Sequence, residues 1–353
     1  MKKSFFLYAV LAALLFGIST PLSKLLIHTI PPAFLASFLY LGAGLGMGIL
    51  FLIQKSNGRT RLEASVNKND LPEISAMILL DIAAPILLMY AVAGTTSSNV
   101  SLLSNFEIVA TSFIAFFIFK EGIGKRMWYA IVLITLGCLI LSFEDTSSLS
   151  FSVGSILVLL ACICWGFENN LTKKLSYRNP VQIVMIKGLG SGFGAWIIAL
   201  IVSDYQWNML YALLGMLLGF SSYGLSIYFY IKAQRVLGAS LTSAYYAASP
   251  FIGAILSLLL LHETINWAFA VALLVMLGGT YIAVSDRHSH VHTHQPITHE
   301  HRHTHDDSHH FHTHGGMCCE HSHIHTHMLL EHDHAHLPDL QHSHTHSKRR
   351  FQK

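Results

Sequence analysis

The sequence predicts an all-α membrane protein with ten transmembrane helices, followed by a disordered, histidine-rich tail. Apolar residues make up 52% of the 353-residue chain and charged residues only 12%, against about 25% charged residues in soluble domains. Apolar stretches recur along residues 5–285, and basic residues fall in alternate connections between them. The same composition argues against a soluble enzyme, and a net charge of +3 is too small for a nucleic-acid-binding surface.

Ten segments approach the length of about 20 mostly apolar residues that a bilayer-spanning helix needs. The predicted helices cover Phe5–Ile27, Pro32–Gln54, Ile74–Ala93, Ser98–Phe119, Met127–Phe143, Gly154–Leu171, Val181–Ser203, Met209–Ile231, Ser240–Leu261 and Trp267–Ser285. Lys2 and Lys3 also resemble the start of a signal peptide, but no small-x-small cleavage site follows cleanly. We therefore interpret the first segment as a transmembrane helix.

The distribution of Lys and Arg predicts the orientation of these helices. With the N-terminus inside, the basic residues between helices fall on the inner side, near residues 2–3, 55–68, 120–126, 173–178 and 232–235. The outer connections hold acidic residues instead, namely Glu144, Asp145, Asp204 and Glu263. We expect a multi-pass protein of the cell membrane with both termini in the cytoplasm.

The helical part of the chain repeats itself. Phe16-Gly17 matches Trp165-Gly166 at an offset of 149, and the alternating glycines of 42–48 match those of 188–194 at an offset of 146. Lys120-Glu121 matches His262-Glu263 at an offset of 142. Five helices per copy is an odd number, so the copies, residues 1–145 and 146–286, should lie in opposite orientations across the membrane. Inverted repeats are typical of secondary transporters.

The alternating glycines allow two interpretations. Glycines four residues apart lie on one helix face and permit close helix contact in lipid. Backbone that lines a substrate path is the alternative. A dinucleotide-binding fingerprint is excluded, since the run lies inside an apolar helix with no preceding strand.

The duplicated motifs resemble the EamA-type branch of the drug/metabolite transporter superfamily over about residues 5–285. Leu15-Phe16-Gly17 with Lys24, and Cys164-Trp165-Gly166 with Lys173-Lys174, begin the two halves. Leu102–Glu107 leads to Lys120-Glu121, and Ala248-Ser249-Pro250 leads to His262-Glu263. The resemblance implies ten helices, a central cavity and export of small metabolites or drugs. Ile108 departs from it, because the family often has proline after the glutamate, and the tail is not part of the pattern.

Ionisable residues at membrane depth are functional candidates because burying charge there is costly. Glu107, near the middle of its helix, could carry a proton or a cation. Glu168 and the adjacent Asn169 could contact substrate, and Lys187 could pair with Glu168 or Glu107. Asp81, four residues before Pro85, is a further candidate. The alternatives are structural carboxyls bonded to neighbouring groups and a lysine that snorkels to the interface.

Three aromatic residues are candidates for lining a substrate cavity: Tyr40, Trp165 and Tyr245. Their alternative role is ordinary packing or anchoring at the membrane interface. Glu121 and Glu263, which end equivalent helices, are expected to make structural terminal contacts.

The tail, residues 287–353, holds 22 of the 24 histidines in clusters spaced by 10 or 11 residues, and it has too little apolar content to fold. Neutral imidazole suits Zn, Ni, Co and Cu, so the tail is predicted to bind divalent metal. The alternative is a solubilising tail that binds metal incidentally. The candidate ligands are His288, His290, His292, His294, His299, His301, His303, His305, His310, His312, His314, His321, His323, His325 and His327.

The leading functional hypothesis is a secondary-active transporter that exports small organic solutes by alternating access. The alternative is efflux of divalent metal or metal chelates, with the tail as collector or sensor. An enzyme is not expected, because the chain has no His-Glu-x-x-His, Gly-x-Ser-x-Gly or phosphate-loop motif. We expect a small-molecule substrate, the lipid bilayer and tail-bound metal as partners, with no required cofactor and no nucleic acid.

Overall fold

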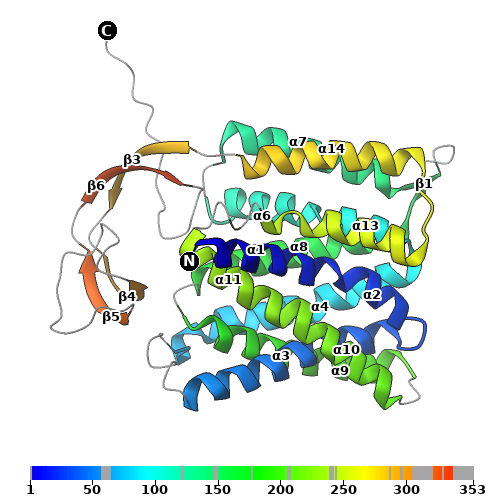
Figure 1. Cartoon of the computed structure of the whole chain (residues 1–353), viewed down its shortest axis with the longest axis horizontal. Helices are drawn as coiled ribbons and strands as arrows, with labels where there is room; N and C mark the ends of the chain where they lie inside the picture. The colour runs from blue at the N-terminus through cyan, green and yellow to red at the C-terminus, as the bar shows by residue number, and fades with distance from the viewer. Residues whose placement is uncertain are drawn as a thin grey trace, which may run out of the picture.

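The computed structural model describes residues 2–56, 65–120, 123–145, 150–175, 178–204, 208–237, 242, 245–285, 288–294, 297–303, 321–327 and 330–336. Up to residue 285 the described segments form a bundle of helices that lie side by side (Figure 1). The helices are α1 (Lys2–Gly17), α2 (Ser19–Leu26), α3 (Pro32–Ser56), η2 (Lys68–Asp70), α4 (Leu71–Gly94), α5 (Ser97–Leu103), α6 (Phe106–Phe117), α7 (Lys125–Ser142), α8 (Val153–Lys174), α9 (Pro180–Val202), α10 (Met209–Gly219), η3 (Phe220–Leu225), α11 (Ser226–Leu237), α13 (Ser249–Leu261) and α14 (Trp267–Val284).

Within the described ranges, nine helical stretches are long and apolar enough to cross a membrane. They correspond to the first eight predicted segments and the tenth. The predicted ninth segment, Ser240–Leu261, coincides with the shorter α13, and residues 240–241 and 243–244 lie outside the described residues. Large apolar side chains point outward, with Ile201 78% and Leu274 70% exposed, as expected of a lipid-facing surface. The prediction of a multi-pass helical membrane protein is confirmed.

Three of these spans are interrupted near their middle. The first breaks between α1 and α2, where Pro21 has no N–H to donate to the carbonyl of Gly17, four residues earlier. The fourth breaks between α5 and α6, where the Asn105 side-chain amide donates to the Leu102 carbonyl at 2.9 Å. This break forms although position 108 is isoleucine. The eighth contains the π-helical turn η3, a feature frequent at functional sites.

The alternating glycines allow helices to pack closely. A Cβ atom on Gly44 would lie 2.5 Å from the backbone nitrogen of Leu189, and one on Gly188 would lie 2.5 Å from that of Gly44. A Cβ on Gly42 would meet the Met216 carbonyl of α10. The face of α3 that carries Gly44 therefore contacts α9, and the face that carries Gly42 contacts α10. The packing interpretation is confirmed, and this close approach fixes α3 against α9.

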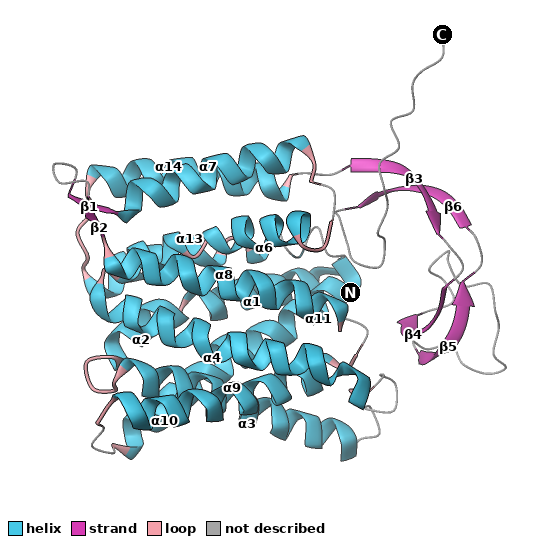
Figure 2. Cartoon of the chain, turned by 180° about the vertical axis from the view of Figure 1, so that it is seen from behind, coloured by secondary structure: helices cyan, strands magenta, loops and turns pink. Residues whose placement is uncertain are grey.

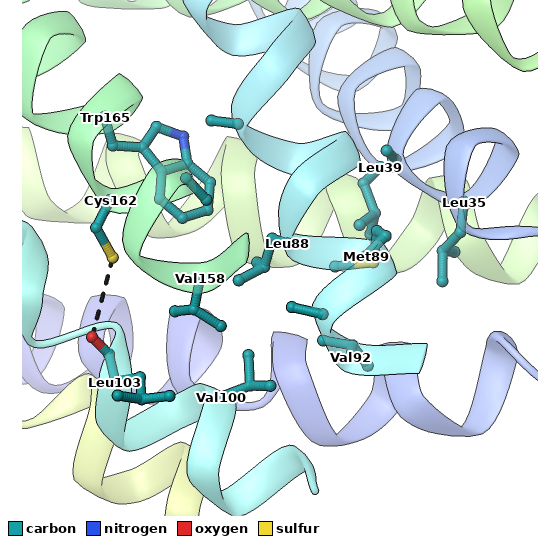
Figure 3. Close-up of a cluster of buried hydrophobic side chains, with 14 of the residues drawn as sticks. Leu35, Leu39, Leu88, Met89, Val92, Val100, Leu103, Val158, Cys162 and Trp165 are labelled. Carbon is teal, nitrogen blue, oxygen red and sulfur yellow. Dashed lines mark hydrogen bonds between the residues drawn. The ribbon is translucent and has the colours of Figure 1, made fainter. Parts of the chain in front are cut away.

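Figure 3 shows part of the apolar core, where α4, α5 and α8 meet. Val100, Leu103, Val158 and Cys162 have no exposed surface. The Cys162 thiol donates to the Leu103 carbonyl, with 3.9 Å between sulfur and oxygen, close to the break that precedes α6. Tight packing here holds the interrupted fourth span against α8.

In the described part of the chain, six short strands accompany the helices (Figure 2). β1 (Phe143–Asp145) pairs with β2 (Ser150–Phe151) in the connection between α7 and α8. In the tail, β3 (His288–His294) pairs with β6 (Leu330–His336), and β4 (Ile297–His303) pairs with β5 (His321–His327). The alternating His-x-His sequences of these segments match the two-residue period of a strand.

Candidate functional site

A buried group of three charged residues joins three helices in the middle of the bundle. The Lys187 ammonium on α9 lies 3.0 Å from Asp81 Oδ2 on α4 and 2.5 Å from Glu168 Oε1 on α8. The side chains of Lys187, Asp81 and Glu168 are 14%, 1% and 7% exposed. We call these three residues the charged triad. The predicted pairing of Lys187 with Glu168 is present, and Asp81 is its second partner.

Aromatic and hydroxyl groups surround the charged triad. The Tyr40 hydroxyl on α3 donates to Asp81 Oδ1 at 3.3 Å, and the Trp165 indole N–H donates to the Tyr40 oxygen at 3.4 Å. The Thr172 hydroxyl, one turn after Glu168 on α8, donates to Glu168 Oε1. These bonds offset part of the cost of burying carboxylates away from water.

Glu107, at the start of α6, forms a second polar group beside the first. Its Oε1 accepts a hydrogen bond of 2.7 Å from the Asn169 amide, which also lies 3.3 Å from the Thr111 hydroxyl. Asn170 donates to the Thr111 carbonyl at 3.1 Å, which ties α8 to α6. Because Asn169 follows Glu168 directly, α8 links the two polar groups.

The charges of these groups do not balance. If every group is ionised, three carboxylates (Asp81, Glu168 and Glu107) face the single cation of Lys187, which leaves two negative charges. Unpaired charge at membrane depth is strongly unfavourable. The arrangement therefore favours uptake of a proton or of a cationic group, and this is the chemistry that it can perform.

Glycines bring the polar groups together. At the α3–α9 contact, a Cβ on Gly188 would also lie 2.9 Å from the Tyr40 carbonyl. Because Gly188 directly follows Lys187 on α9, this contact brings Tyr40 close to Lys187. Between α6 and α8, a Cβ on Gly166 would lie 2.9 Å from the Thr111 backbone nitrogen. Larger residues at either position would separate Tyr40 from the charged triad, or Glu107 from Asn169.

An aromatic series continues from the charged triad across the bundle. The ring of Tyr223, in η3, lies 5.5 Å from that of Tyr40 and 5.6 Å from that of Phe16, and Phe16 in turn lies 5.5 Å from Tyr246. The predicted Tyr245 instead packs against Phe6 at 5.8 Å, near the start of α1. The structure thus places Tyr40 and Trp165 beside the charged triad and Tyr245 apart from it.

Three residues of the site are not among those predicted from the sequence. Thr111 and Thr172 each stand four residues after a candidate carboxylate, Glu107 and Glu168, so helical spacing was a signal that could have found them. Tyr223 had no such signal, because its position depends on the π-helical turn of η3.

Charged side chains also occupy the end of the bundle where α4 ends and α5 begins. The Lys24 ammonium donates to the carbonyls of Val92 at 2.6 Å and Thr95 at 2.8 Å. The Glu263 carboxylate accepts from the backbone N–H groups of Ser97 at 2.7 Å and Ser98 at 2.8 Å. An open pocket of about 300 Å³ lies between these contacts. The expected structural role of Glu263 is confirmed, whereas Glu121 lies outside the described residues.

The predicted tail ligands fall partly outside the structure. His305, His310, His312 and His314 lie outside the described residues. In the described strands, each histidine of β4 lies opposite a histidine of β5, for example His301 opposite His323. Among the described residues, no group of three or more His, Cys, Asp or Glu side chains is placed to hold a metal ion.

Comparisons with known proteins point in one direction. The model of the EamA-like transporter family matches residues 3–143 and 152–285. An uncharacterized transporter of Methanothermobacter thermautotrophicus (strain Delta H) is 29% identical over 290 residues, which cover 77% of this chain and 83% of that protein. A solved structure described as "Crystal structure of protein" has a TM-score of 0.58 at 16% identity, covers 79% of this chain and 95% of that chain, and shows likeness of fold alone.

Proposed function

This chain belongs to the EamA-like transporter family, and on that premise we propose that it exports small metabolites or drugs by secondary-active alternating access. The family and the relative named as a transporter support a membrane transporter rather than an enzyme. The observation that carries the proposal is the charged triad, because an excess of carboxylates at membrane depth can exchange a proton or a cationic group during a transport cycle.

We propose that ten helices form two inverted repeats, residues 1–145 and 146–286, with both termini in the cytoplasm. The family model supports this arrangement because it matches the chain twice. Backbone geometry supports it too. Among the described residues, the non-glycine positions with positive φ are Lys120 (59°) and His262 (51°), which are equivalent in the repeat.

In this proposal each polar group has its own role. Glu107 takes up and releases the coupling proton or cation. Its hydrogen bond to Asn169 couples the protonation or occupancy of Glu107 to the position of α8. Lys187 holds Asp81 and Glu168 together until substrate or a proton competes for one of them. Tyr40 and Trp165 form the wall of the path beside the triad.

Transport in sealed vesicles tests the proposal. The full chain is reconstituted, a proton gradient is imposed, and a panel of amino acids, organic cations and metals is screened for flux. We expect at least one small organic solute to move faster than in empty vesicles and to stop moving when the gradient is collapsed. Flux that is equal with and without protein for the whole panel contradicts the proposal.

Efflux of divalent metal or of a metal chelate is the second candidate function, favoured by the 22 histidines of residues 287–353. In this version the tail binds Zn, Ni, Co or Cu and supplies it to the membrane domain. Deletion of residues 287–353 separates the two candidates. Loss of metal transport alone favours the second, and unchanged solute export with loss of metal binding makes the tail accessory.

A further inference from the structure

A small cavity of about 20 Å³ lies where the interrupted first and fourth spans meet α13. A cavity needs roughly 10–15 Å³ to hold one particle of the size of water, so there is room for one such particle. Its polar lining comes from Gly17, Thr20, Ser101, Ser104 and Ser249. The cavity is separate from the charged triad, which shares none of these residues.

Two of the lining oxygens have incomplete hydrogen bonding. Ser101 is 2% exposed, and within the described residues its Oγ has no hydrogen-bond partner. The Gly17 carbonyl cannot receive the usual helical bond, because residue 21 is proline. The two oxygens lie close to each other beside Gly253, because a Cβ built on that glycine would lie 2.8 Å from Gly17 O and 2.9 Å from Ser101 Oγ, and both residues line the cavity. A buried oxygen without a partner is unfavourable, so an occupant that contacts both is stabilising.

The chemistry of the lining selects a cation over an anion. The Ser104 hydroxyl already donates its proton to the Val100 carbonyl at 2.9 Å, so it offers only lone pairs to the cavity. The Gly17 carbonyl is likewise an acceptor. None of the residues that line the cavity is acidic, whereas divalent cations are normally held by carboxylates. Neutral oxygens in a small space therefore fit a monovalent cation.

We propose that this cavity binds one desolvated monovalent cation, ligated by the Gly17 carbonyl and by the hydroxyls of Thr20, Ser101 and Ser104. Bound there, the ion joins the α1–α2 junction to α5. The site is also linked to Glu107 through Ser104, one of the proposed ligands, because the Ser104 carbonyl accepts a hydrogen bond of 3.1 Å from the Glu107 N–H. The site goes beyond the proposed export function and does not depend on it.

Direct ion binding tests the site without any transport substrate. The full chain, purified in detergent, is titrated with ²²Na⁺ and, separately, with ⁸⁶Rb⁺ as a tracer for K⁺, at constant ionic strength with choline. We expect saturable binding of at least one tracer, displaced by the unlabelled ion. Thr20→Val and Ser101→Ala each remove a ligand oxygen and should weaken binding roughly tenfold or more.

Ser155→Ala is the matched control, because Ser155 Oγ on α8 is also buried and has no hydrogen-bond partner in the part of the chain that the structure describes, but lies outside the cavity. Its binding curve should match that of the unmodified chain, and in choline no variant should melt at a lower temperature than the unmodified chain. Absence of saturable binding for both tracers overturns the site, as does equal binding by Ser101→Ala, Thr20→Val and the unmodified chain. Because no flux is measured, a failure here is distinct from a failure of the export proposal.

Discussion

Lys187 and Glu168, on the consecutive helices α9 and α8, form an ion pair of 2.5 Å in the interior of the bundle. The same ammonium also holds Asp81 at 3.0 Å, so one cation joins two carboxylates that would otherwise repel each other. Much of the expected behaviour of this transporter follows from that arrangement.

Lys187→Met should lower both stability and transport. The variant leaves Asp81 and Glu168 buried without a counter-ion, and breaking a buried ion pair costs about 3–5 kcal/mol. We expect a lower melting temperature in detergent and a loss of vesicle flux of roughly tenfold or more. Adding Asp81→Asn should restore part of the melting temperature but not the flux. A double variant no more stable than Lys187→Met would contradict the pairing.

Glu107→Gln should abolish proton-driven transport while the fold persists. The glutamine carbonyl still accepts a hydrogen bond from the Asn169 amide, but the side chain can no longer take up a proton. Flux in vesicles with an imposed proton gradient is the measurement, and the melting temperature checks the fold. Glu73→Gln, at a half-buried carboxylate in the first turn of α4 and outside both polar groups, is the control and should transport normally. Normal gradient-driven flux in Glu107→Gln would remove this residue from the mechanism.

Gly188→Ala should separate α3 from α9 and disturb the charged triad. The new methyl group would lie 2.5 Å from the Gly44 nitrogen and 2.9 Å from the Tyr40 carbonyl, so the backbones must move apart. We expect a lower melting temperature and slower flux. Gly278→Ala is the matched control, because its Cβ would meet nothing within 4 Å, and the higher helix propensity of alanine should leave stability unchanged or slightly raised. Equal effects of the two substitutions would argue against the contact.

Glu263→Ala should destabilise the start of α5. The carboxylate accepts two backbone N–H groups that otherwise have no partner within the helix, and loss of such a cap costs about 1 kcal/mol. Thermal unfolding of the purified chain measures this change, and Glu263→Asp tests whether carboxylate reach matters. We expect the aspartate variant to lie between the parent and the alanine variant.

Zinc binding by the tail should weaken in acid. Imidazole takes up a proton below about pH 6.5, and a protonated ring cannot ligate metal, so the affinity should fall as the pH drops through that range. Calorimetric titration of the full chain with Zn²⁺ at pH 7.5 and pH 5.5 measures the change. The chain without residues 287–353 should bind far less zinc at either pH, and binding that survives the deletion places the metal elsewhere.

The sequence alone predicts the helical segments well, because length and apolar content decide which stretches can cross a bilayer. It also predicts that Lys187 has a carboxylate partner. It does not predict that Asp81 is the second partner, since that contact depends on how α4, α8 and α9 are placed relative to one another. The close contact of α3 with α9 at Gly44 and Gly188 helps to fix the position of α9. The spacing of the glycines indicates that such a contact exists, but not which helix makes it.

Because Glu168 and Asn169 are consecutive residues of α8, they point about 100° apart, one toward Lys187 and the other toward Glu107. A rotation of α8 about its own axis cannot loosen one of these contacts and leave the other in place. Glu168 and Glu107 are therefore coupled through one rigid helix, so that a change in the contact of either carboxylate also changes the contact of the other.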